Sequence, residues 1–209
     1  MEYIGDVFYE YGGGLYANIT NKCPDRCEFC IRYMVDSLGG ADSLWLKREP
    51  TMEEILELLD QWDLSKFEEL VFCGYGEPML KLAILKEVCQ YLKDNYPKIK
   101  IRVNTNGHAN YVFGKNVVPE LKGLVDLFSV SLNGVDEKEY NELSQPKFDG
   151  AYEEVKKFIK ACSDCGIKVV ASVVEGYKGR HIDLENCEKT AKELGADFRA
   201  REWIPAGYS

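Results

Sequence analysis

Three cysteines, Cys23, Cys27 and Cys30, lie within a single short stretch near the start of the chain. Their C-x3-C-x2-C spacing lets several thiolates converge on one soft metal centre without the ordering of a long loop. A cluster of four irons held by three thiolates keeps one iron open. An open position can bind a substrate or cofactor directly, as it does in catalytic zinc sites. The spacing therefore predicts a site-differentiated iron–sulfur cluster.

Two other interpretations of the cysteines remain, a zinc site completed by a remote residue and an accidental grouping. Structural zinc normally takes four ligands, often arranged as two pairs. The only other close pair, Cys162 and Cys165, falls at the end of a predicted helix, on the opposite rim of the fold. The eight cysteines of the chain, with no export signal ahead of them, are typical of thiols or metal ligands.

Further glycine-rich and polar motifs follow predicted strands. In Gly74-Tyr75-Gly76-Glu77-Pro78, the glycines allow close backbone approach to a ligand and Glu77 offers an acceptor for a cationic group. A plain strand-to-helix turn would use similar residues. Asn104, Ser131 and Asn133 carry polar side chains that suit a vicinal diol, although Asn-Gly is also a common turn dipeptide.

The elements that must position these motifs alternate between strand and helix. Thr51 and Glu54 form a capping box at the start of the first helix, and Gly195 ends the last one. Helical spacing of apolar residues predicts helices near 51–62, 82–92, 119–121, 152–162 and 184–194. The predicted strands are Leu15–Thr20, Glu69–Cys73, Lys100–Asn104, Leu124–Leu132, Lys168–Val174 and Asp197–Ile204.

This alternation implies parallel strands joined by right-handed crossovers, in an α/β fold. Six such strands fit either an open doubly wound sheet or an incomplete barrel, and in both the chemistry gathers at the carboxyl ends of the strands. Each unusual cluster follows a strand: the cysteine loop, GYGEP, NTNG, SLNG, VEGY and REWIP. We therefore expect one rim to carry all the candidate chemistry.

Composition limits the partners. The net charge of −9 disfavours nucleic acid and anionic membrane surfaces, which both require an excess of Lys and Arg. No apolar run approaches the roughly 20 residues of a membrane span, and the N-terminus lacks the features of a secretory signal. We expect a single cytoplasmic domain spanning residues 1–209 that acts on a small molecule.

The cysteine motif, with an aromatic residue just before its last cysteine, resembles the signature of the radical S-adenosylmethionine (SAM) superfamily. The resemblance covers about residues 16–205 and implies a partial (β/α)6 TIM-like barrel of parallel strands. It also implies one 4Fe–4S cluster held by Cys23, Cys27 and Cys30, which cleaves SAM reductively to a 5′-deoxyadenosyl radical. A reductant such as flavodoxin or ferredoxin would supply the electron.

The same resemblance assigns cofactor contacts. GYGEP is similar to the family's Gly-Gly-Glu motif, which holds the methionine ammonium, although Tyr75 replaces the second glycine of that pattern. Asn104, Ser131 and Asn133 match the family's ribose and carboxylate contacts. The implied SAM-binding residues are Phe29 and Val174 beside the adenine, Gly74, Gly76, Glu77, Asn104, Ser131 and Asn133.

The kind of substrate must be inferred from the other residues at this edge of the sheet. Aromatic side chains could stack on a planar ring, and acidic ones could accept from an amidine-like edge, although each is more often a core or surface residue. The candidates are Tyr33, Trp45, Tyr75, Glu175, Glu202 and Trp203.

The lead-in YEYGGGLYANITNKCPDRCEFC resembles the small TatD-associated radical SAM subgroup, which includes a queuine lyase acting in queuosine salvage. This resemblance implies queuine as the leading substrate, with release of a 7-deazaguanine base. One alternative is a glycyl-radical activating enzyme, whose substrate is a protein backbone. The other is a noncatalytic iron–sulfur electron carrier, in which four protein ligands would be the rule.

Overall fold

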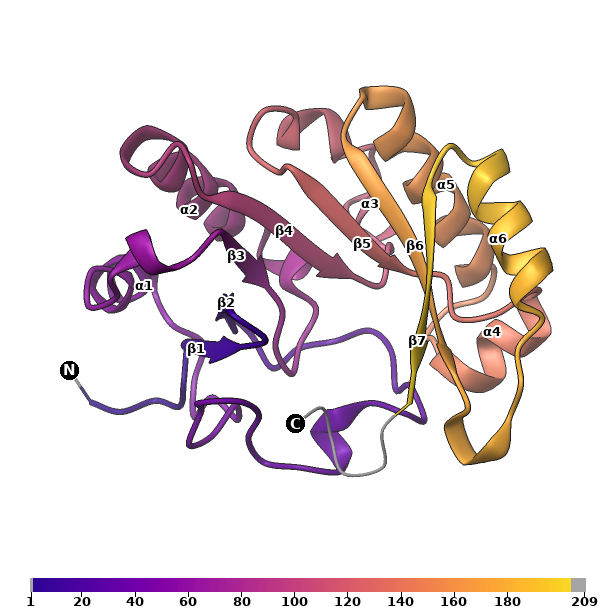
Figure 1. Cartoon of the computed structure of the whole chain (residues 1–209), viewed down its shortest axis with the longest axis horizontal. Coiled ribbons are helices and arrows are strands. Elements are labelled where there is room, and N and C mark those ends of the chain that lie inside the picture. Colours follow the sequence, from indigo (N-terminus) through magenta and orange to yellow (C-terminus); the bar gives the residue numbers. More distant parts are fainter. Residues whose placement is uncertain (1, 204–209) are drawn as a thin grey trace.

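The computed structural model describes residues 2–203, whose strands form one sheet (Figure 1). The strands are β1 (Phe8–Tyr11), β2 (Gly14–Ala17), β3 (Glu69–Phe72), β4 (Lys100–Thr105), β5 (Leu127–Ser131), β6 (Lys168–Glu175) and β7 (Asp197–Glu202). They lie in chain order across the sheet. β1 and β2 are antiparallel and every later pair is parallel, so the carboxyl ends of β2 to β7 share one rim.

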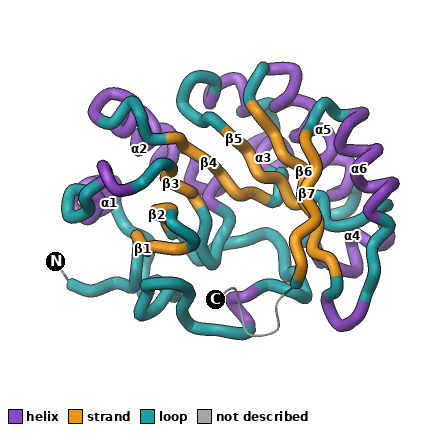
Figure 2. The backbone as a smooth tube through the Cα atoms, in the orientation of Figure 1, coloured by secondary structure: helices purple, strands orange, loops and turns teal. Residues whose placement is uncertain are grey.

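Helices lie outside the sheet and leave its inner side to loops, as Figure 2 shows. The helices are α1 (Met52–Leu59), α2 (Leu82–Asn95), α3 (Ala109–Phe113), α4 (Glu137–Ser144), α5 (Ala151–Cys165) and α6 (Leu184–Glu193). The predicted capping box is present: Thr51 accepts from the Glu54 backbone N–H, and the Glu54 side chain accepts from the Thr51 N–H. Such a box satisfies two backbone donors that the helix itself leaves free.

Side-chain alternation along the strands separates the two faces of the sheet. On β4, Ile101 and Val103 are fully buried in the core that the helices complete. Arg102 and Asn104 point to the other side, where they line a cavity. Neighbouring side chains of a strand point to opposite faces of the sheet. One strand therefore contributes apolar side chains to the core and polar side chains to the cavity.

The α/β class with a largely parallel sheet is as predicted, but β1, α3 and α4 were missed. α3 has five residues, which are too few to show a clear helical period. β1 adds a seventh strand, and it runs antiparallel to β2. Its four residues are too few to show a clear period. α4 was also missed because it is mostly polar, although Asp136 caps it by accepting from the Glu139 N–H. The last predicted strand is observed as β7, while Ile204 and Pro205 lie outside the described residues.

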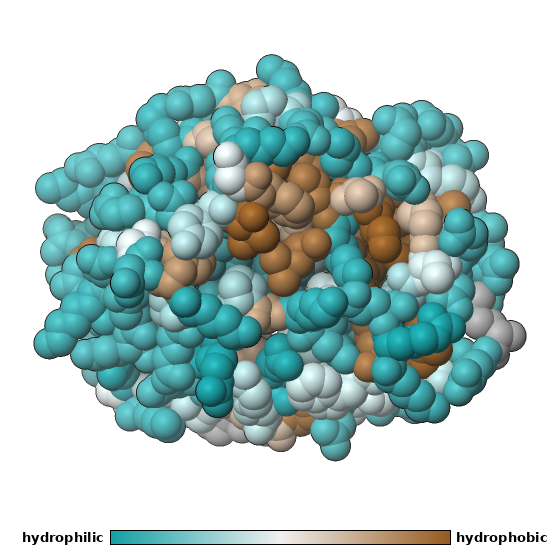
Figure 3. Space-filling view, turned by 180° about the vertical axis from the view of Figure 1, so that it is seen from behind, coloured by the Kyte–Doolittle hydropathy of each residue, from teal (hydrophilic) through white to brown (hydrophobic). Residues whose placement is uncertain are grey.

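The surface seen from behind is largely hydrophilic, with apolar residues gathered near its middle (Figure 3). Within residues 2–203, every helix falls short of the length and apolarity that a bilayer crossing requires.

Candidate functional site

The cysteine loop follows β2 and is anchored by its own backbone. Glu28 N–H donates to the Leu143 carbonyl at 2.9 Å, and Arg26 N–H donates to the Ser144 carbonyl at 3.1 Å, both near the end of α4. The loop ends in a 3₁₀ turn at Ile31–Tyr33. Three cysteines close in sequence are thereby held beside α4, a helix more than a hundred residues further along the chain.

The thiols of Cys23, Cys27 and Cys30 are free and only partly exposed. Burial raises the pKa of Cys23 to about 12 and also raises the pKa of Cys27 and Cys30. The three thiols also act on one another: Cys30 raises the pKa of Cys23, and both raise that of Cys27. They therefore lie within electrostatic reach of each other.

This donor set fits an iron–sulfur cluster. Thiolates are the soft ligands that such clusters take, and the positive charge of iron stabilises the thiolate that burial alone disfavours. In the part of the chain that the structure describes, no three His, Cys, Asp or Glu side chains form a site for a single metal ion. A cluster binds each thiolate through a different iron, so its ligands need not converge on one point.

The two glycines of GYGEP allow close contact, but the group that contacts them is another segment of this protein and not a ligand. A Cβ at Gly74 would lie 2.1 Å from Asn18 Oδ1, and a Cβ at Gly76 would lie 2.2 Å from the Thr20 carbonyl. Asn18 Oδ1 in turn accepts from the Tyr75 N–H at 3.3 Å. Both glycines therefore let the loop after β3 pack on the segment that leads into the cysteines.

Glu77 is buried, at 5 % exposure, and its carboxylate accepts hydrogen bonds from residues at the end of β4. Oε1 accepts from the Thr105 hydroxyl at 2.8 Å and from the Met79 N–H at 3.0 Å, while Oε2 accepts from the Asn106 N–H at 2.8 Å. Burial nevertheless raises the pKa of Glu77 to about 7. A cationic ligand beside it would stabilise the ionised form.

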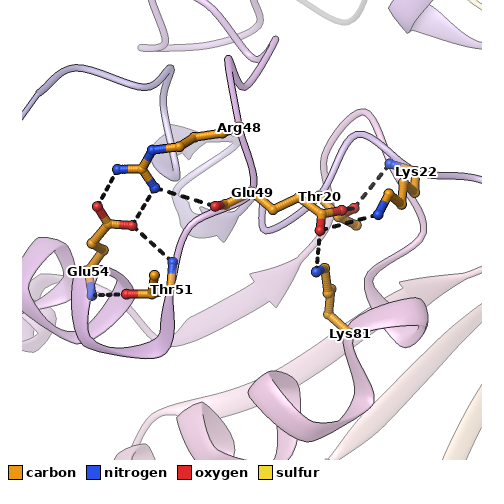
Figure 4. Close-up of polar contacts among 7 residues, drawn as sticks. All are labelled: Thr20, Lys22, Arg48, Glu49, Thr51, Glu54 and Lys81. Carbon is orange, nitrogen blue, oxygen red and sulfur yellow. Dashed lines mark hydrogen bonds and ion pairs between the residues drawn. The ribbon is translucent and has the colours of Figure 1, made fainter.

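A second carboxylate, Glu49, joins the start of the cysteine loop to the segment after GYGEP (Figure 4). It accepts from the Thr20 hydroxyl at 2.7 Å and forms ion pairs with Lys22 and Lys81. Its neighbour Arg48 pairs with Glu54, the residue of the α1 capping box. The sequence showed no local signal for Glu49, because its partners are distant along the chain.

A cavity of about 500 Å³ opens on the inner side of the sheet, next to the cysteine loop. Of the predicted residues it is lined by Phe29, Cys30, Gly74, Asn104, Val174 and Glu202. Residues that were not predicted also line it: Tyr9, Tyr11, Tyr16, Cys73, Arg102, Ser129, Arg199 and Arg201. One cavity thus joins the cysteine motif to the strand ends.

The cavity is cationic, although the chain as a whole is not. Arg102, Arg199 and Arg201 line it with one carboxylate, Glu202, whereas the net charge of the chain is −9. Arg102 donates to Glu69 at 2.7 Å. The Nε atoms of Arg102 and Arg201 are buried and have no hydrogen-bond partner among the described residues. Because buried donors are normally satisfied, these atoms point to a ligand that supplies acceptors.

Cys73 lies among these guanidinium groups. Burial raises the pKa of its thiol, while a hydrogen bond from Asn104 and the charges of Arg201 and Arg102 act the other way. β4 and β7 therefore bring their arginines to the same part of the cavity. Cys73 also acts on Cys30 electrostatically, which places a fourth thiol near the cysteine loop.

Three aromatic rings connect the cysteine loop to the ends of β6 and β7. Phe29 and Tyr177 pack edge to face with ring centroids 5.9 Å apart, and Tyr177 packs against Trp203 at 5.1 Å. The Tyr177 hydroxyl donates to the Glu28 carbonyl at 2.8 Å. Tyr177 belongs to the VEGY motif, but it was not among the predicted site residues.

Several predicted substrate residues support the loops and do not line the cavity. Tyr75 is 2 % exposed, donates to the Val35 carbonyl and packs on Trp45. Tyr33 is exposed on the surface. Glu175 accepts from the Ile182 N–H at 2.9 Å and pairs with His181, so it closes its own loop.

Four predicted cofactor residues also lie outside the lining: Gly76 and Glu77, described above, and Ser131 and Asn133. Asn133 is buried at 2 % exposure and donates to Ser144 at 3.1 Å, which ties β5 to α4. Ser131 pairs with Ser172 of β6 in the sheet, and Ser129, two residues earlier on the same strand, lines the cavity in its place.

Comparisons with known proteins agree with this arrangement. The family model described as "Radical SAM superfamily" matches residues 17–194. An uncharacterized protein of Methanocaldococcus jannaschii is 22% identical over 136 residues, which cover 65% of this chain and 43% of that protein.

Solved structures share the fold at low sequence identity. SuiB of Streptococcus suis bound to S-adenosylmethionine aligns with a TM-score of 0.66 and 17% identity, over 92% of this chain and 41% of SuiB. Methylornithine synthase aligns at 0.61 and 14%, over 93% and 54%. The enzyme anSMEcpe with bound AdoMet aligns at 0.59 and 16%, over 90% and 50%. This chain therefore spans about half the length, or less, of the proteins it matches.

Proposed function

Because the chain belongs to the radical SAM superfamily, we propose that the cavity beside its cysteine loop binds a small-molecule substrate from which a SAM-derived radical abstracts hydrogen. Members of this family bind SAM and a 4Fe–4S cluster, and these supply a 5′-deoxyadenosyl radical when bound. The observation that carries the proposal is the shared lining: Phe29 and Cys30 of the motif face the same space as the arginines of β4 and β7.

We assign a separate role to each group of residues at the site. Cys23, Cys27 and Cys30 would hold the cluster. Glu77 would stabilise the cationic end of SAM from beneath the loop, since its buried carboxylate gains from a nearby positive charge. Phe29, backed by Tyr177, would cover one side of the cofactor and exclude water from the cavity.

Asn104 is the best-placed polar residue for the cofactor or the substrate. Its Oδ1 is buried and lacks a hydrogen-bond partner within residues 2–203, and the residue lines the cavity. Val174 lines the cavity on β6 and offers an apolar contact. Ser131 and Asn133 would act less directly, by fixing the end of β5 beside α4.

For the substrate we propose queuine, cleaved by a lyase reaction that releases a 7-deazaguanine base. The support is the resemblance of the lead-in sequence to the TatD-associated subgroup, together with the chemistry of the cavity. Tyr9, Tyr11 and Tyr16 supply flat aromatic surface, Glu202 can accept from ring N–H groups, and Arg201 can donate to a ring carbonyl.

Anaerobic reconstitution followed by SAM and dithionite tests the reaction class. We expect release of 5′-deoxyadenosine. A chain that takes up iron but does not change its spectrum on addition of SAM, and releases no 5′-deoxyadenosine, would be an electron carrier. Mass spectrometry after incubation with queuine then tests the substrate: a smaller deazaguanine supports it, and intact queuine beside ongoing SAM cleavage rejects it.

A further inference from the structure

An exposed apolar patch lies on α3, and the proposed function does not use it. Within residues 2–203 six large apolar side chains are exposed, and three of them are consecutive in α3. These three, which we call the α3 patch, are Tyr111, Val112 and Phe113, at 49 %, 44 % and 38 % exposure. Single exposed apolar residues are common, but a contiguous group on a polar surface is typical of a site that binds another protein.

The segment after α4 joins the α3 patch to the cysteine loop. The Tyr111 ring stacks on Phe148, with ring centroids 3.8 Å apart and an angle of 6° between the planes. The residue before it, Lys147, donates from Nζ to the Cys23 carbonyl at 3.5 Å. The three thiols of the motif are themselves partly exposed. The α3 patch therefore belongs to the surface next to the cysteines.

This part of the surface is locally cationic. In residues 22–30, 145–149 and 178, the exposed cationic side chains are Lys22, Arg26, Lys147 and Lys178. Lys22 pairs with Glu49 and Lys178 pairs with Glu28, which leaves Arg26 and Lys147 with one other exposed carboxylate in these segments, Asp149. The chain as a whole carries a net charge of −9, so an excess of cations here differs from the rest of the molecule.

The chemistry proposed for the site needs one electron from outside the protein. A carrier protein can supply it only if its own redox centre comes close to the cluster, so the carrier must dock on the surface next to the thiols. Redox partners use small, transient interfaces, and opposite charges steer their encounter. An apolar patch beside cations that attract an anionic protein has both features of such an interface.

We propose that the α3 patch, together with Arg26 and Lys147, is the docking surface for an acidic electron-carrier protein. The reduced carrier loses one electron, and the cluster gains it. The inference rests on the proposed function, because the transfer requires a cluster on the cysteine loop.

Calorimetric titration with flavodoxin, chosen as an acidic carrier, tests the docking without enzyme activity. We expect Lys147→Glu to weaken binding roughly three- to tenfold at low ionic strength, because it replaces an attraction with a repulsion. Added salt should reduce the difference from the wild type, since the Debye length falls from about 30 Å at 0.01 M to about 8 Å at 0.15 M.

Lys66→Glu is the matched control for this titration. It makes the same change in net charge, its side chain is 71 % exposed, and it precedes β3, at the opposite rim of the sheet. Its affinity for flavodoxin should stay close to that of the wild type. Equal affinities in Lys147→Glu and Lys66→Glu, or no binding of flavodoxin to the wild type, would overturn the proposal.

Tyr111→Ser tests the apolar part and leaves the charges in place. We expect weaker flavodoxin binding at high as well as low salt, because an apolar contact is not screened. Tyr3→Ser, at another exposed ring, is the control and should bind as the wild type does. A wild-type chain that sediments as a dimer and becomes a monomer in Tyr111→Ser would make the patch a self-association surface and overturn the proposal.

A second readout separates this inference from the proposed function. With dithionite, a small reductant that needs no docking surface, Lys147→Glu should release 5′-deoxyadenosine at the wild-type rate. With reduced flavodoxin below saturation, its rate should fall by the same factor as its affinity. A wild type that is inactive with both reductants would reject the proposed function, whereas equal flavodoxin-driven rates in Lys147→Glu and wild type would reject only the docking surface.

Discussion

Arg32 donates a hydrogen bond from Nη1 to the Tyr75 carbonyl at 3.0 Å, which joins the cysteine loop to GYGEP across 43 residues of sequence. The same atom donates to the Asn21 carbonyl at 3.1 Å, and the guanidinium lies 4.8 Å from the ring of Trp45. Arg32 therefore adds a side-chain connection between the two motifs to the contacts that Asn18 and Glu49 make. No local sequence pattern identifies Arg32 as that connection.

Replacing Arg32 with alanine should loosen both motifs together. Charge-assisted hydrogen bonds contribute about 1.5–3 kcal/mol, so we expect the free energy of unfolding to fall by about 2 kcal/mol. SAM affinity, measured by calorimetry on the reconstituted protein, should also fall. Arg26→Ala changes an exposed arginine of the same loop and is the control. Equal SAM affinity in the two variants would contradict the role of Arg32.

Cysteine variants distinguish three cluster ligands from four. Cys27→Ala should abolish the cluster, while Cys165→Ala, at the end of α5, should retain it. Cys73→Ser is the informative case, because Cys73 lies near Cys30 but is hydrogen-bonded to Asn104. We expect iron and sulfide per chain to match the wild type in Cys73→Ser. Loss of the cluster there would make Cys73 a fourth ligand and favour the electron carrier.

Glu77 should make stability depend on pH. Its pKa is raised from 4.5 to about 7 by burial, so the folded chain keeps a proton that the unfolded chain loses as pH rises above about 4.5. The folded state therefore binds more protons in this window, and its free energy of unfolding falls as pH rises to about 7. The full effect is on the order of 3 kcal/mol.

Denaturant titrations of the cluster-free chain at several values between pH 5 and 7.5 measure this slope. Glu77→Gln should flatten it, at the cost of a hydrogen bond to the end of β4. Glu57→Gln, at an exposed position of α1, should leave the slope as it is in the wild type. If Glu77→Gln and Glu57→Gln gave the same slope, another group would be responsible.

The hydroxyl of Tyr177 should contribute to stability, and its ring should contribute to SAM binding. Tyr177→Phe loses the hydrogen bond to the Glu28 carbonyl, which should lower stability by about 1 kcal/mol and leave SAM affinity nearly unchanged. Tyr177→Leu also removes the edge-to-face contact with Phe29, and we expect weaker SAM binding. Tyr111→Phe, at an exposed ring, serves as the control. Unchanged SAM affinity in Tyr177→Leu would show that Phe29 needs no support.

Arg201 should act on the substrate and not on SAM. Losing a charge-assisted hydrogen bond of about 1.5–3 kcal/mol corresponds to roughly a 10- to 100-fold rise in KM for Arg201→Gln. The slow release of 5′-deoxyadenosine without substrate should stay at the wild-type rate. Arg180→Gln, whose side chain pairs with Glu142 on the surface, should change neither quantity. A fall in substrate-free SAM cleavage in Arg201→Gln would instead place Arg201 at the cofactor.

The class of fold and the type of chemistry could be predicted from local patterns in the sequence. Apolar periodicity and the Thr51 capping box are local, and local patterns are sufficient to predict alternating strands and helices. The spacing of Cys23, Cys27 and Cys30 is local as well, because the loop that holds them is short. β1 and α3 were not predicted because they are too short to show a clear period, and α4 was not predicted because it is mostly polar.

Which side chains line the cavity and which support it from outside could not be predicted from local patterns, because it depends on contacts between distant segments. Arg102 and Arg201 lie on strands that are not neighbours in the sheet, yet both line the same cavity as Cys73. Tyr75 looks like a binding residue in its motif, yet it packs inward on Trp45. Asp25 and His108 are separated by 83 residues, yet His108 Nδ1 lies 3.3 Å from Asp25 Oδ1. Contacts between distant segments form when whole elements pack together, so no short stretch of sequence specifies them.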